Sequence, residues 1–267
     1  MARALHDDRE VAIALDGLVA IGVLLGSLPE TLGLRMQLEQ LHRQQHDSTN
    51  LAQDLTGRAD LLIRLGRFDQ AEEPLKEIEA AAAAGNQALA SRARRVALLR
   101  AIAASESHDF AGAIAHAQDV LARSAALKSP DTTLGIAEAL LTNARGALNR
   151  TAEIRRWTSL QPAVFSRELR YWRGVALLSA GDPGGAALEA DAALVDIADR
   201  PSAEFEWRMT AIAAASARRR GDQGKATQMA ERAQAALNTL RGAWKGDASD
   251  YDRRADLTEL RRAAGIS

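Results

Sequence analysis

The chain has 267 residues, enough to bury a sizeable core in one large domain or in an elongated repeat array. Aromatic residues make up only 4% and alanine dominates the apolar 47%, a composition that favours packed helices over a β-sandwich. The 34 basic and 35 acidic side chains leave a net charge of −1, which gives no overall field for nucleic acid or an anionic membrane, and the absence of cysteine excludes disulfides and thiolate chemistry.

The first long apolar stretch covers residues 11–28 and reads VAIALDGLVAIGVLLGSL. It is short for a bilayer span and carries Asp16 in its interior. The preceding residues, MARALHDDRE, mix both charges, unlike the basic start of a signal peptide. We therefore expect a buried helix of the fold here and no membrane association. Together with the absence of cysteine, this favours a cytoplasmic protein.

About six helical hairpins follow one another in the predicted fold. The turn between the two helices recurs about every 40 residues, with one shorter interval, and its second position holds Leu28, Phe68, Phe110, Thr151, Pro183 and Gln223. The apolar pattern predicts first helices near residues 9–25, 50–65, 88–105, 132–148, 164–180 and 203–220. Their partners are expected near residues 29–46, 70–84, 110–127, 151–160, 184–199 and 223–243.

Turn chemistry supports these boundaries independently of the period. Gly181 and Gly221 stand where the end of a helix needs a left-handed residue. Asp182 and Asp222 follow as N-caps, and Pro183 occupies the first helical position, where its missing N–H costs nothing. The sequence thus predicts a tight turn between two helices at both places.

Residues 244–267 differ from the hairpins that precede them. A polar break, KGDASDYD, follows Trp244, and residues 253–264 have the pattern of a short helix. The terminal units of helical repeat arrays need a polar outer face, which this helix offers. We therefore divide the chain into a repeat array, residues 1–243, and a polar break with a C-terminal capping helix, residues 244–267.

The clearest unit, LLIRLGRFDQAEEPLKEI at residues 61–78, resembles the tetratricopeptide repeat. Gly66, Phe68 and Ala71 match, in order, the small residue, the aromatic residue and the alanine of that family's turn. The unit length of about 40 residues is similar to the long variety found in kinesin light chains and in the repeat regions of bacterial signalling proteins, including Ser/Thr kinases. The resemblance implies a right-handed α-α superhelix of about six hairpins, a solenoid.

In that family the first helices line the inner, concave face, so the resemblance implies a partner groove there. The positions that map onto this face are Gln53, Thr56, Asp60, Arg64, Arg95, Leu98, Asn143, Tyr171, Arg208 and Arg219. The implied function is a non-enzymatic interaction scaffold for a peptide or protein partner. The alternative is a regulatory sensor domain of a bacterial signalling system that binds a small ligand or a peptide.

Histidines are the candidates for chemistry. His42 and His46 stand four residues apart, a spacing that can hold a metal ion, but a stable site needs a third or fourth ligand. The surrounding sequence, HRQQHDST, is typical of a solvated helix end. His108 and His116 lack the positioned partner that a general base needs. Because GxSxG, HExxH and phosphate-binding glycine motifs are also missing, we predict no enzyme, no metal and no cofactor.

The large aromatic residues gather in the second half of the chain. They are Trp157, Phe165, Tyr171, Trp172, Phe205 and Trp207. The preference of large aromatic side chains for burial predicts that most of them fill the core. Any that remain exposed would instead be anchors for a partner.

Overall fold

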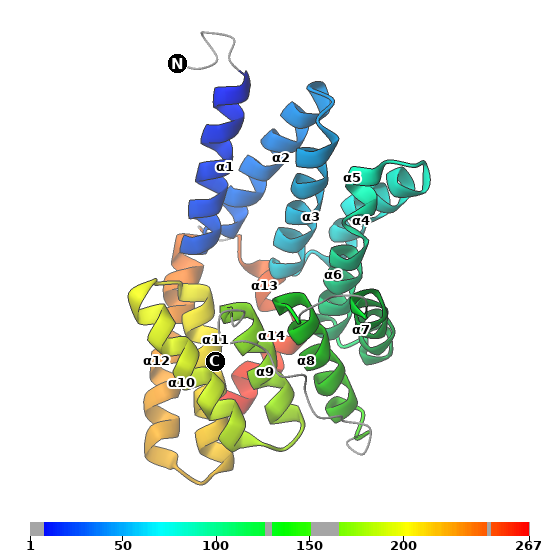
Figure 1. Cartoon of the computed structure of the whole chain (residues 1–267). Helices are drawn as coiled ribbons and strands as arrows, with labels where there is room; N and C mark the ends of the chain where they lie inside the picture. Colours follow the sequence, from blue (N-terminus) through cyan, green and yellow to red (C-terminus); the bar gives the residue numbers. More distant parts are fainter. Residues whose placement is uncertain (1–7, 126–129, 151–165, 245–246, 267) are drawn as a thin grey trace.

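The computed structural model describes residues 8–125, 130–150, 166–244 and 247–266. These residues contain helices and no β-strand, which confirms the all-α prediction. In chain order the helices are α1 (Asp8–Leu25), α2 (Leu28–Gln44), α3 (Ser48–Arg64), α4 (Phe68–Ala83), α5 (Gln87–Ala90), α6 (Ala93–Glu106), α7 (Phe110–Ser124), α8 (Thr132–Ala147), α9 (Arg167–Ser179), α10 (Pro183–Asp199), α11 (Ala203–Arg219), α12 (Gln223–Ala243), α13 (Ser249–Asp252) and α14 (Ala255–Ala264). Most neighbours in this order pack against each other, as in a helical repeat (Figure 1).

The predicted hairpin boundaries agree with these helices. The second helices α2, α4, α7, α10 and α12 begin within two residues of the predicted starts, at the predicted turn positions Leu28, Phe68, Phe110, Pro183 and Gln223. The second helix predicted near residues 151–160 lies outside the described residues. The helix predicted over residues 88–105 is divided into α5 and α6 by a turn at Ser91 and Arg92. Packing in consecutive pairs fits a helical repeat, and the right-handed superhelix stays a prediction.

The turn residues have the conformations that the sequence requires. Gly66, Gly181 and Gly221 all have φ of 81°. Asp182 accepts a hydrogen bond from the backbone N–H of the third residue after it, and Asp222 caps the next turn in the same way. The prediction of left-handed glycines followed by N-caps is confirmed, and these turns fix where each second helix starts.

Gly66 differs from the other turn glycines in its surroundings. A Cβ at Gly66 would lie 2.7 Å from the backbone oxygen of Asp250, whereas a Cβ at Gly221 would meet nothing within 4 Å. Gly221→Ala therefore measures left-handed strain alone, about 1–2 kcal/mol. We expect Gly66→Ala to lower the free energy of unfolding by about 1–3 kcal/mol more, because the overlap adds to the strain. Urea denaturation of both variants checks this, and equal losses would contradict a tight contact between Gly66 and Asp250.

Residues near the C-terminal end of the described chain contact residues in its first three helices and their turns. Trp244 donates its Nε1–H to the carbonyl oxygen of Gly26 (2.6 Å), in the turn between α1 and α2. Arg254 donates to the carbonyl oxygen of Arg64 (2.8 Å), at the end of α3. Helix α14 packs against α6 and α11, and Figure 1 places it in the middle of the molecule. The predicted C-terminal helix therefore forms, but it fills the interior instead of covering only the last hairpin.

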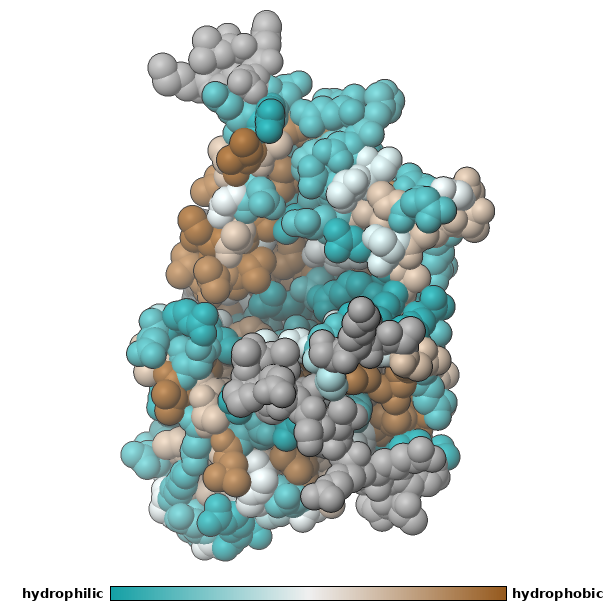
Figure 2. Space-filling model, in the orientation of Figure 1, coloured by the Kyte–Doolittle hydropathy of each residue, from teal (hydrophilic) through white to brown (hydrophobic). Residues whose placement is uncertain are grey.

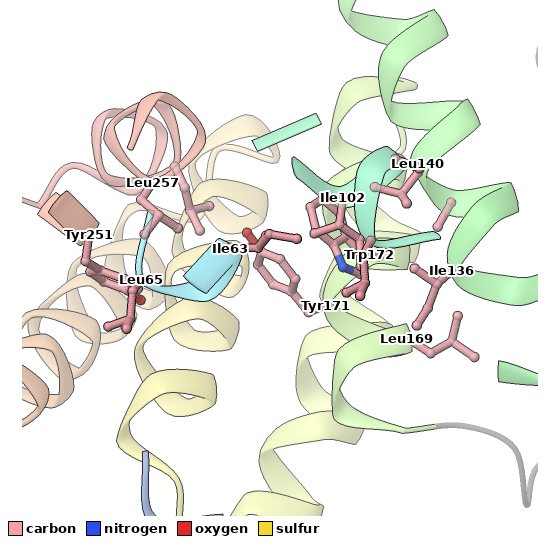
Figure 3. Packing of buried hydrophobic residues seen from close by; sticks show 14 of the residues in the cluster. Ile63, Leu65, Ile102, Ile136, Leu140, Leu169, Tyr171, Trp172, Tyr251 and Leu257 are labelled. Atoms are coloured by element: carbon pink, nitrogen blue, oxygen red, sulfur yellow. The ribbon is translucent and has the colours of Figure 1, made fainter. Parts of the chain in front are cut away.

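One hydrophobic cluster joins the two halves of the described chain. Figure 3 shows Tyr171 and Trp172 of α9 among buried side chains of α3, α6 and α8. Trp207 of α11 donates its Nε1–H to the hydroxyl of Tyr251 (2.7 Å), which comes from α13. The prediction that aromatic residues fill the core is confirmed for Tyr171, Trp172 and Trp207. Outside the described residues lie Trp157 and Phe165.

Helix α1 is less buried than the sequence predicts. It packs against α2, and Val19 is its buried residue. Large apolar side chains on its other side are 50–66% exposed, namely Ile13, Leu18, Ile21, Leu24 and Leu25. Figure 2 shows hydrophobic residues gathered over α1 on the left of the molecule. The expectation of a buried helix is therefore wrong for this face. Among the described helices, none has both the length and the apolar character of a membrane span.

Candidate functional site

The ten residues predicted to line a partner groove differ widely in exposure. The exposed ones are Gln53 and Arg219, the partly buried ones are Asp60, Arg64 and Arg95, and the buried ones are Thr56, Leu98, Asn143, Tyr171 and Arg208. The C-terminal segment covers part of the surface that these residues were expected to offer, since α14 packs against both α6 and α11. The first helices thus enclose two pockets.

Two of the ten residues have structural roles. Thr56 donates its hydroxyl to backbone carbonyl oxygens of its own helix, those of Ala52 (3.0 Å) and Gln53 (2.9 Å). Leu98 is fully buried in the hydrophobic cluster. Neither side chain is placed to touch a partner.

The larger pocket has a volume of about 540 Å³ and lies between α3, α9 and the start of α11, with the end of α1 and α6 completing its wall. It brings together four of the predicted residues, which are Asp60, Arg64, Tyr171 and Arg208. Apolar surface comes from Ile63, Ile102, Trp172 and Phe205. A concave, partly apolar surface with a few charged groups is typical of a ligand site.

A buried cluster of Glu204, Arg64 and Arg208 lies beside the larger pocket, and its two arginines are part of the pocket wall. Glu204 is fully buried. It pairs with Arg208 (2.9 Å) on its own helix and with Arg64 on α3. Burial alone would raise the pKa of Glu204, but the two guanidinium groups outweigh it and lower this pKa to about 2. Glu204 therefore stays charged and joins α11 to α3.

A second cluster forms around Arg254. This side chain is buried and contacts Glu106 of α6 (2.6 Å) and Asp256 of α14 (2.8 Å). Burial raises the pKa of Glu106 to about 8, because the charge of Arg254 only partly offsets it and Asp256 adds a repelling charge. The Oε2 atom of Glu106 is buried without a hydrogen-bond partner among the described residues, and Glu106 lines the larger pocket.

Glu168, in the first turn of α9, is the other acid that stands out in the larger pocket. It is partly buried and makes no hydrogen bond or ion pair with any residue that the structure describes. Burial raises the pKa of Glu168, although the positive charge of Arg95 opposes this effect. The sequence interpretation did not include Glu106, Glu168 or Glu204.

The smaller pocket, about 340 Å³, lies between α6, α8, α9 and α14. Asn143, one of the predicted residues, donates to the hydroxyl of Ser105 (3.1 Å) and accepts from the hydroxyl of Ser179 (2.5 Å). Arg219 donates to the carbonyl oxygen of Leu178. Tyr171 and Trp172 line both pockets. The polar groups of the smaller pocket are therefore largely bonded to one another.

Among the described histidines, His42, His46 and His116 lie apart from both pockets, and His108 lines the edge of the smaller one. His42 is buried, and its Nδ1 lies 2.5 Å from Asp54, which also accepts from Arg35 (2.8 Å). The interpretation of a solvated helix end is wrong for His42, whereas His46 is exposed. Within the described residues, no three His, Cys, Asp or Glu side chains are grouped to hold a metal ion.

The larger pocket is the stronger candidate site, because it combines apolar and aromatic surface with the carboxyl group of Glu168 and one oxygen of Glu106, which lack partners among the described residues. Helices α1, α3, α6, α9 and α11, which are first helices of the predicted hairpins, contribute residues to its wall. Comparison of the chain with protein-family models, with curated proteins and with solved structures found no match.

Proposed function

We propose that this chain is a non-enzymatic binding module that takes a compact ligand, a small molecule or a short peptide segment, in the larger pocket. The observation that carries the proposal is the convergence of α1, α3, α6, α9 and α11 on one concave surface that has charged and apolar walls. The pocket has a volume of about 540 Å³. That volume is within the range of small-molecule sites, roughly 300–1,000 Å³.

The composition of the pocket wall supports the same function. Its charged side chains come mainly from α3, α6, α9 and α11, and ion pairs such as Arg64–Glu204 fix the positions of most of them, Glu168 excepted. Rigid helices hold these groups in place before a ligand arrives, which lowers the entropy cost of binding. The proposal thus agrees with the sensor alternative from the sequence and assigns the ligand to the larger pocket.

Leu24 and Leu25 allow a matched test. Both are more than half exposed at the end of α1, at 55% and 62%, but only Leu24 lines the larger pocket. We expect a fragment screen to find ligands that raise the melting temperature of the unaltered chain. The same ligands should raise the melting temperature of Leu25→Trp. They should not raise that of Leu24→Trp, because its indole fills the pocket. A ligand at 100 times its Kd should raise Tm by roughly 5–10 °C. A screen without hits, or hits that Leu24→Trp retains, would contradict the proposal.

A protein-binding scaffold is the second candidate, favoured by the exposed apolar face of α1. The occupant that fits is an amphipathic helix of a partner protein, because the exposed Ile13, Leu18, Ile21 and Leu25 follow helical spacing on one side of α1. Ile21→Asp changes this face and leaves the pocket lining unaltered. A captured partner that binds the Leu24→Trp variant and is lost with Ile21→Asp would favour the scaffold.

A further inference from the structure

We propose that the ligand of the larger pocket carries a positive charge, an ammonium or guanidinium group, which pairs with Glu168 while the apolar part of the ligand lies on Phe205 and Trp172. The inference rests on the proposed function of this pocket and names the chemistry of its ligand. Its support comes from the balance of paired and unpaired charges on the pocket wall.

The basic side chains that line the pocket already have acidic partners. Arg64 and Arg208 pair with Glu204, and Arg167 pairs with Asp196 (2.5 Å). Arg200, the remaining described arginine of the lining, also pairs with Asp196. Each of these four arginines therefore has an acidic partner, and they share two carboxylates, those of Glu204 and Asp196.

The acidic side chains are not balanced in the same way. Asp60 pairs with Arg95 (2.9 Å), and one oxygen of Glu106 contacts Arg254. The other oxygen of Glu106 and the whole carboxyl group of Glu168 lack a hydrogen-bond partner among the described residues. The free oxygen of Glu106 is buried, where a missing partner is unfavourable, whereas Glu168 is partly exposed. A cation that enters the pocket supplies the missing partner.

The raised pKa values of Glu106 and Glu168 agree with this arrangement, since both result mainly from burial. Groups around Glu168 are mixed in sign, with Arg95 and Arg64 opposing the rise and Asp60 and Glu204 adding to it.

The aromatic surface suits an organic cation. The guanidinium of Arg64 lies 6.0 Å from the ring centre of Phe205, and that of Arg208 lies 5.0 Å from the ring centre of Tyr171. The interior thus already places cations over aromatic faces, an attraction worth about 0.5–2 kcal/mol. A free amine and the basic side chain of a short peptide share this chemistry.

Melting temperatures of the full chain test the inference with three probes at rising concentration. The probes are 4-phenylbutylamine, its neutral analogue 4-phenylbutanol, and an acetylated and amidated Phe-Lys dipeptide. We expect the amine or the dipeptide to raise Tm and the alcohol to have little effect. The stronger of the two cationic probes then indicates whether the source is a free amine or a peptide.

Glu168→Gln is the matched variant, with Glu206→Gln as control because Glu206 is on α11 outside the pocket lining. We expect Glu168→Gln to weaken the binding of the cationic probes about tenfold or more, since a charge-assisted hydrogen bond is lost. Its own Tm should not fall, because the change removes an unpaired charge. The control should bind the probes as the unaltered chain does.

Three results would overturn the inference: equal effects of the amine and the alcohol, unchanged binding to Glu168→Gln, or no response to either cationic probe. The proposed function is tested separately by the fragment screen. If fragments bind, Leu24→Trp abolishes their binding, and the cationic probes do not raise Tm, the pocket is a ligand site of different chemistry. If the screen also fails, both proposals are wrong.

Discussion

Replacing Glu204 by Gln is expected to lower the free energy of unfolding by about 3–5 kcal/mol at neutral pH. The variant leaves Arg208 buried and Arg64 partly buried without their shared carboxylate. A buried charge that loses its only compensating partner is among the most destabilising changes in a core. Urea denaturation of the full chain measures the loss. Glu206→Gln, two residues away and partly exposed, should cost less than about 1 kcal/mol.

The loss of unfolding free energy caused by Glu204→Gln should become smaller as the pH falls. The folded pKa of Glu204, about 2, lies below its ordinary value of 4.5. The stabilisation by the charged carboxylate is therefore complete above about pH 4.5 and is lost as the pH falls toward 2. The difference between the natural chain and Glu204→Gln should narrow over that interval. A difference that stays constant from neutral pH to pH 3 would show that the carboxylate is not the stabilising group.

Arg254→Met is expected to have an effect of similar size, about 3–5 kcal/mol. The guanidinium has four kinds of partner: the backbone oxygen of Arg64, Glu106, Asp256 and the ring of Tyr251 at 5.5 Å. Methionine keeps much of the length and apolar volume of the side chain, so the loss reports on charge and hydrogen bonding. Thermal and urea unfolding of the full chain measure it.

Arg253→Met is the matched control, because the neighbouring Arg253 is largely exposed and pairs only with Asp250. It should change stability by less than about 1 kcal/mol. For Arg254→Met the loss should be nearly constant below about pH 8 and should grow above it, since the pKa of Glu106, about 8 in the natural chain, is raised further when the cation is removed. The unfolded chain then releases a proton that the folded chain holds. A pH-independent loss would contradict the contact with Glu106.

The helical hairpins could be predicted from the sequence because their signals are local. Gly181, Asp182 and Pro183 each determine a conformation within a few residues, so the start of α10 is fixed by neighbours in the chain. Alanine content and helical periodicity settle the fold class for the same reason. The short turn that separates α5 from α6 was missed because it lacks glycine and proline.

The interior could not be predicted, because it depends on contacts between distant residues. Arg254 follows a polar stretch that reads as solvated, and its partner carbonyl at Arg64 is 190 residues away in sequence. Glu106 carried a usable signal, since it lies four residues after the buried Ile102 and so shares its helix face. Helix α1 illustrates the opposite case: its apolar pattern predicts burial, but the described chain supplies no cover for its outer side.

The contact of Trp244 with Gly26, together with that of Arg254 with Arg64, changes how the fold should respond to damage. In an open repeat array each unit touches only its neighbours, so the ends can fray while the middle remains folded. Here the turns at Gly26 and Arg64 contact the segment from Trp244 to Arg254, and each stabilises the other. Removal of either one takes a buried partner from the other, so the two ends should unfold together. The segments around Gly26 and Arg64 and the segment from Trp244 to Arg254 should therefore form one cooperative unit of the described structure.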